Sequence, residues 1–249
     1  MPSRTPSVAR RFAPALLLAC TLAACGAPVA SAPTAALAPT TAASASNAGS
    51  VDLSGIKTYL VGKAGELKAA SADLKAISDR YYDLAKAANF DYAALAKASH
   101  DDLVTSISAA REVWKKASPL YEQMEGIVAG TPSLAQFDVD MDAGSSKADG
   151  GDNVVGFDLK LPDGRVLQKP GNLFGVTEST LWGTFADFRA KDVTLDIDGN
   201  GKQDFGDTMP DANVLKGGVD ELAAQSAKLA DSAAAWQPTE ADAFTAPGS

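Results

Sequence analysis

Apolar side chains recur every three or four residues from residue 53 onwards, which predicts long amphipathic helices. Charged residues occupy the positions between them and would form the solvated face. Residues 89–91, Asn-Phe-Asp, interrupt the first run, and Asp91 is a suitable N-cap for the helix that follows. The apolar stripe of the first run consists of Leu53, Ile56, Leu60, Ala64, Leu67, Leu74, Ile77, Tyr81 and Leu84.

Two further periodic runs predict the remaining long helices. The second extends from Tyr92 to about Ile127 and contains Ser118-Pro119, where we expect a kink or a restart because proline removes a helical hydrogen bond. Gly130-Thr131-Pro132 should end this segment. The third run, Val214 to Trp236, begins with a helix-weakening Gly217-Gly218 pair.

Between the helical runs, the pattern changes to that of strands and turns. Apolar residues alternate with Asp138, Asp140 and Asp142, which predicts a short strand with one acidic face. That face is either a candidate cation or ligand site or simply an exposed strand edge. Residues 155–161 and 165–169 flank Pro-Asp-Gly, which predicts a β-hairpin.

These patterns together predict a mainly α fold. We expect a bundle of long antiparallel helices over residues 51–236, with a hairpin insert at about 137–170 and an acidic loop at 196–207. Residues 237–249 are polar and are expected to form a flexible tail.

The N-terminus has the features of a secretory signal. A basic start with Arg4, Arg10 and Arg11 precedes an apolar core that ends in Leu-Ala-Ala-Cys at Cys25. This ending resembles the lipobox of bacterial lipoproteins, which implies a signal peptide at 1–24 and a lipid on Cys25. The alternatives are an ordinary signal peptide cut after Ala24 or a short membrane anchor, although the apolar core is shorter than the roughly 20 residues that span a bilayer.

The composition narrows the remaining possibilities. Residues 25–50 would be the lipidated cysteine and a disordered Ala/Ser/Thr/Pro tether. The only other cysteine, Cys20, lies in the signal, so no disulfide is expected. The chain has a formal net charge of −9, which disfavours nucleic acid and can attract cations.

One informative stretch is the acidic segment at 196–207, which resembles the calcium loop of EF-hand and dockerin repeats. Oxygen-bearing side chains stand at loop positions 1, 3, 5, 9 and 12, and Gly201 stands at position 6, where the loop turns sharply. A polar surface turn is the alternative. The candidate calcium ligands are Asp196, Asp198, Asn200, Lys202, Asp204 and Asp207.

The stretch Leu173–Gly183 resembles the signature of imelysin-like proteins, a family that includes EfeO-type iron-uptake lipoproteins. Glu178 and the Leu-Trp-Gly ending at Gly183 match, whereas the signature's first Gly and its His fall on Leu173 and Gly175. The resemblance implies an envelope protein that acquires iron or another ligand, with Glu178 in the site and an envelope permease or other iron-uptake component as partner. Family members usually carry further helices beyond this point.

The same resemblance raises the question of peptidase activity, which the residues do not favour. A nucleophilic site would need a Cys or an activated Ser, and a zinc hydrolase would need about three protein ligands. The chain's one His, His100, stands beside two acids and is expected to be exposed and paired. We therefore expect a non-catalytic, lipid-anchored binding protein that faces the periplasm or the exterior. The alternatives are a calcium-stabilised structural or interaction module and a truncated, inactive paralogue.

Overall fold

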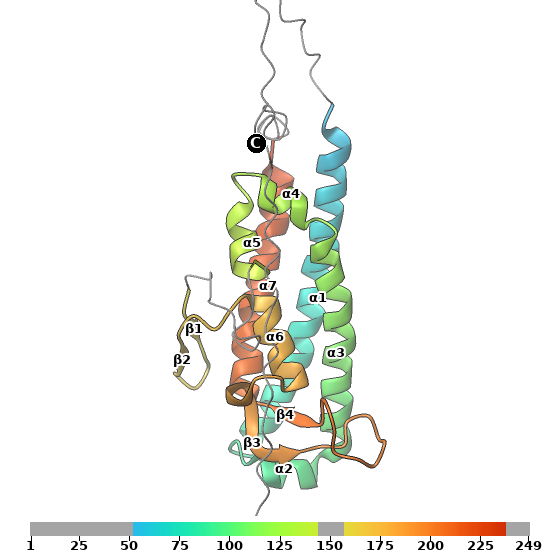
Figure 1. The fold of residues 1–249 in the computed structure, drawn as a ribbon, viewed down its shortest axis with the longest axis vertical. Helices are drawn as coiled ribbons and strands as arrows, with labels where there is room; N and C mark the ends of the chain where they lie inside the picture. Colours follow the sequence, from blue (N-terminus) through green and yellow to red (C-terminus); the bar gives the residue numbers. More distant parts are fainter. Residues whose placement is uncertain (1–51, 144–156, 238–249) are drawn as a thin grey trace, which may run out of the picture. The chain divides into compact units, whose positions relative to one another are not determined.

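The computed structural model describes residues 52–143 and 157–237, which belong to one compact unit (Figure 1). The predicted signal peptide, lipidated Cys25, tether and nearly all of the tail lie outside the described residues, as does the middle of the hairpin insert. No helix within the two described ranges is long and apolar enough to cross a membrane.

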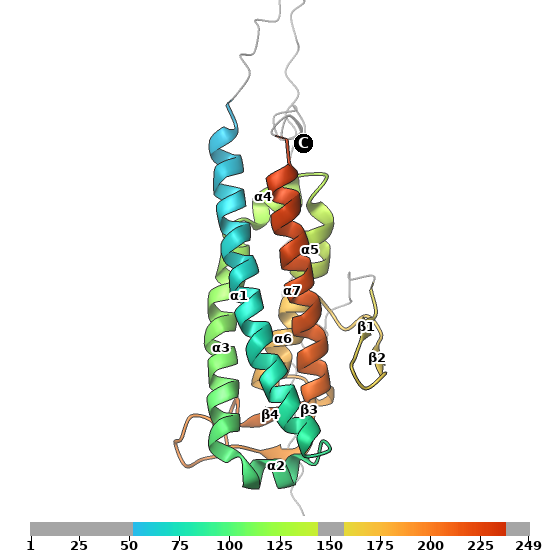
Figure 2. The same cartoon turned by 180° about the vertical axis from the view of Figure 1, so that it is seen from behind.

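The predicted helical bundle is confirmed. Its two longest helices, α1 (Ser54–Ala87) and α7 (Ala212–Ala235), pack along each other, and α3 (His100–Glu122) packs on α1 (Figure 2). The shorter α6 (Leu173–Trp182) lies against α7 and α3. Most of the predicted stripe of α1 is buried against these neighbours, namely Leu60, Ala64, Leu67, Leu74 and Tyr81.

The second predicted helix is interrupted twice. It consists of α2 (Tyr92–Ala98), α3 and α4 (Glu125–Gly130), with breaks at Ser99 and at 123–124. The first break turns the chain so that α2 reaches β3. The predicted cap is confirmed, since the Asp91 carboxylate accepts a hydrogen bond from the Ala94 amide at 2.9 Å. The helix continues through Pro119, so the restart comes a few residues later than predicted.

The predicted acidic strand at residues 137–142 is wrong, because these residues form α5 (Ala135–Met141) and its C-terminal end. Leu134 and Met141 are fully buried and Phe137 packs against the same core. Their separations of three and four residues fit a helix, and this packing outweighs the two-residue alternation. The helical pair Gln136–Asp140 adds a side-chain hydrogen bond of 2.9 Å.

The hairpin is present but short, with antiparallel β1 (Leu159–Lys160) and β2 (Val166–Leu167). It packs on α7 at Gly217, where a β-carbon would come within 2.7 Å of a Leu161 methyl group. The Gly217-Gly218 pair therefore has a packing role at the start of α7, where the Asp211 carboxylate caps the helix.

The segment that resembles the signature forms α6, and the Asn172 side chain caps it by accepting from the Gly175 amide at 2.6 Å. A short 3-10 turn, η2 (Ala186–Phe188), leads into β3 (Arg189–Thr194), which pairs antiparallel with β4 (Thr208–Pro210). The acidic loop therefore connects two strands at one end of the bundle (Figure 1).

Candidate metal sites

The acidic loop brings together the predicted ligands at its positions 1, 3 and 12. Carboxylate oxygens of Asp196, Asp198 and Asp207 lie within 4.8 Å of one another. Asp196 is half-buried, Asp198 is exposed and Asp207 is only 3% exposed, so the group extends from solvent into the protein. These are oxygen donors of the kind that hard cations prefer.

Backbone amides hold these carboxylates in place. The two oxygens of Asp196 accept from the amides of Asn200 (3.0 Å) and Gly201 (2.8 Å). The buried Asp207 accepts from the amides of Ile197 (2.9 Å) and Asp204 (3.1 Å). The loop is thus wrapped around its own acids, which satisfies the buried polar groups and arranges the oxygens before any ion binds.

The other predicted ligands of the loop lie on its exposed side. The Asn200 amide nitrogen donates to Asp198 (2.8 Å) and to Asp204 (3.1 Å), and the Asn200 oxygen accepts from the backbone amide of Lys202 (2.7 Å). Asn200 is therefore placed between two candidate ligands.

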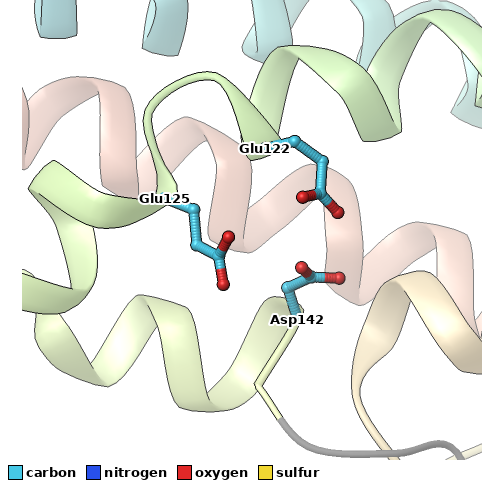
Figure 3. Close-up of side chains that lie close together, drawn as sticks. All are labelled: Glu122, Glu125 and Asp142. Atoms are coloured by element: carbon cyan, nitrogen blue, oxygen red, sulfur yellow. The ribbon is translucent and has the colours of Figure 1, made fainter.

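A second carboxylate group lies where α3, α4 and α5 meet. Glu122 ends α3, Glu125 begins α4 and Asp142 follows α5, and their oxygens lie within 4.8 Å of one another. Figure 3 shows the three side chains pointing into the same space between these segments. Glu122 is exposed, and Glu125 and Asp142 are partly buried. We refer to these three residues as the carboxylate cluster.

The cluster is electrostatically strained. Burial raises the pKa of Asp142 to about 7, and the charges of Glu122, Glu125 and Asp138 and a hydrogen bond to Glu122 act in the same direction. Burial also raises the pKa of Glu125, again with the help of Asp138 and Glu122. Near neutral pH the site therefore has a proton that a cation can displace.

The other two predicted ligands of this region, Asp138 and Asp140, do not belong to the carboxylate cluster. Asp138 lies beside the cluster and accepts a hydrogen bond from the buried Tyr121 hydroxyl at 2.9 Å, and burial followed by this bond raises the pKa of Tyr121. Asp140 is outside the cluster and accepts from Gln136. Of the three predicted acids, only Asp142 contributes to the group that could hold a metal.

Glu178 does not occupy the position predicted for it. We expected a partly buried carboxylate at the wall of a cleft, whereas Glu178 is exposed. The reason is that most side chains of α6, including Phe174, Val176 and Leu181, are buried. Only a narrow strip of the helix reaches solvent. Glu178 lies on that strip with Gly175, the position where the signature has its His.

The sequence pattern did not point to Glu122 and Glu125. Their spacing of three residues is typical of an ordinary solvated helix face. The chain break at 123–124, which brings their side chains together with Asp142, was expected at Ser118-Pro119 instead. His100 is exposed, as expected, and its Nδ1 atom lies 3.0 Å from Asp101.

Comparison with known proteins found no match among family models, curated proteins or solved structures.

Proposed function

We propose that this chain is a lipid-anchored, non-catalytic protein of the cell envelope that binds a metal cation for acquisition, in the manner of imelysin-like iron-uptake proteins. The observation that supports it is the carboxylate cluster of Glu122, Glu125 and Asp142, which three separate segments of the chain bring together.

The electrostatics of the cluster favour a cation. Three carboxylates at this distance repel one another, and without a cation Asp142, whose pKa burial and the neighbouring acids raise to about 7, holds a proton below that pH. A bound metal ion replaces that proton and removes the repulsion. A ligand set made only of carboxylate oxygens suits a hard cation, and the resemblance to iron-uptake proteins adds ferric iron to the ions worth testing.

The imelysin-like resemblance contributes the biological setting. Its matching residues, Glu178 and the Leu-Trp-Gly ending, lie on or end α6, and Glu178 remains a candidate ligand residue on the exposed strip. An iron permease or another iron-uptake component of the envelope would then receive the cargo.

The cluster is tested by titrating purified protein with Ca²⁺ and with ferric citrate, in a background whose acidic loop is disabled by Asp196→Ala and Asp198→Ala. Asp142→Asn should weaken the remaining binding by about tenfold or more, since it removes one of three charged ligands. Binding should also strengthen as the pH rises through about 7, because Asp142 then loses its proton.

Asp140→Asn is the matched control, since it makes the same substitution two residues earlier in the chain, within α5, at a site outside the cluster. It should bind metal as the background does. Equal binding by the Asp142→Asn and Asp140→Asn variants would contradict the role of the cluster, and a specific loss in Glu178→Gln would return the site to α6.

A second function, a calcium-stabilised structural or interaction module, is favoured by the acidic loop. The acids at its positions 1, 3 and 12 converge, as the ligands of a calcium loop do, and the loop connects β3 and β4 at one end of the bundle. The two proposals are compatible, because the loop and the cluster share no residue.

The lipid anchor gives a separate prediction. In bacteria that express the full chain, the wild type should partition into detergent and incorporate labelled fatty acid through Cys25, because the lipobox-like ending implies lipidation there. Cys25→Ser should leave a soluble or uncleaved form without label. Fractionation and labelling of the variant like those of the wild type would exclude the lipoprotein assignment.

A further inference from the structure

We infer that Arg111 is a positioning residue that couples cation binding in the acidic loop to the interface between α3 and α6. The inference rests on the proposed calcium-type role of the loop and names how that site communicates with the bundle.

The half-buried guanidinium of Arg111 connects three elements. From α3, its Nε and Nη2 atoms donate to the carbonyl oxygen of Leu181, in the last turn of α6, at 3.1 and 2.7 Å. The same Nη2 atom donates to the carbonyl oxygen of Gly206 at 2.5 Å. The C-terminal carbonyls of a helix lack partners within the helix, so this contact also completes the end of α6.

Gly206 is directly followed by Asp207, the buried acid of the loop. The Arg111 contact therefore fixes the backbone one residue before a candidate ligand. A β-carbon at position 206 would lie 3.4 Å from Nη1 of Arg111, so the guanidinium fits closely over this part of the loop. Burial lowers the pKa of Arg111, and the charges of Asp207 and Asp198 act against that shift. The two acids therefore favour the charged form of the arginine.

Two tryptophans lie at the same junction. The Arg111 guanidinium carbon is 5.5 Å from the centre of the Trp182 ring, and Trp182 meets Trp114 edge-on with ring centroids 5.2 Å apart. A cation held by Asp198 and Asp207 would neutralise the acids whose charges act on Arg111 and would repel its guanidinium, which lies over the Trp182 ring. Tryptophan emission should therefore respond to the occupancy of the loop.

Arginine contributes here in two opposite ways, and one substitution separates them. Its positive charge opposes a nearby cation, whereas its hydrogen bonds hold Gly206 and hence Asp207 in position. Lysine keeps the charge but has no planar fork that reaches two carbonyl groups. Arg111→Lys therefore tests the positioning role alone.

The test is a Ca²⁺ titration of the purified protein, followed by calorimetry for binding and by tryptophan fluorescence for coupling. The wild type should bind and change its emission, and Trp182→Phe should remove that change without loss of binding. Arg111→Lys should weaken binding by about tenfold, the effect of one lost charged hydrogen bond, and abolish the emission change at saturation. Circular dichroism should show unchanged helix content.

Three outcomes distinguish the possibilities. Wild-type affinity and emission change in Arg111→Lys would overturn the inference and leave the calcium loop intact. Weaker binding with an unchanged emission response at saturation would also overturn the coupling. No Ca²⁺ binding by the wild type would remove the calcium role and the inference with it.

Discussion

Calcium at a hundredfold excess over its dissociation constant should raise the melting temperature of the wild-type protein by roughly 5–10 °C. Binding to the native state alone stabilises it by about 2.7 kcal/mol at that excess, and a domain of this size gains about 2–4 °C per kcal/mol. Asp196→Ala combined with Asp198→Ala should abolish the shift, because it removes two of the three converging acids of the loop. The measurement is thermal unfolding by circular dichroism with and without Ca²⁺.

The matched control is Asp73→Ala combined with Asp231→Ala, which removes the same two charges from exposed helical positions. This variant should keep the full shift. Mg²⁺ at the same concentration should stabilise less, because it demands a smaller and more regular ligand shell. A wild-type melting temperature that does not respond to Ca²⁺ would exclude the loop as a calcium site.

The main features of the fold could be predicted because they depend on local signals. The stripe of α1 follows from its period, and the caps at Asp91 and Asn172 follow from short polar side chains before apolar runs. The acidic loop was also recognisable, since its candidate ligands lie within twelve consecutive residues and three of them meet.

The carboxylate cluster could not be predicted, because its geometry depends on contacts between distant residues. Glu122 and Asp142 are twenty positions apart, and they meet because the chain breaks at 123–124 and α5 folds back beside the break. The strand expected at 137–142 put Asp138, Asp140 and Asp142 on one face, whereas the helix sends Asp140 away from the other two. Burial of Met141 against the core decides between these arrangements.

Gly183, the last residue of the segment that resembles the imelysin-like signature, is expected to be the most sensitive glycine of the bundle. It ends α6 with a φ of 62°, a conformation that disfavours other residues, and a β-carbon there would lie 1.7 Å from Oγ1 and 2.8 Å from Cβ of Thr208. Gly183→Ala should lower the free energy of unfolding by about 3 kcal/mol, the combined cost of backbone strain and overpacking. Urea denaturation measures this change.

Two companion variants separate the causes. Gly65→Ala, on the exposed face of α1 with no atom near its β-carbon, should instead stabilise the protein by about 0.5–1 kcal/mol through helix propensity. Thr208→Ala should recover part of the loss in Gly183→Ala, because it removes the hydroxyl but leaves the Cβ contact and the positive φ. If Gly183→Ala has the same urea midpoint of unfolding as the wild type, the close packing of α6 on β4 is refuted. If the expected loss is found, backbone conformation and packing together account for Gly183, and any ligand role in that segment rests on Glu178.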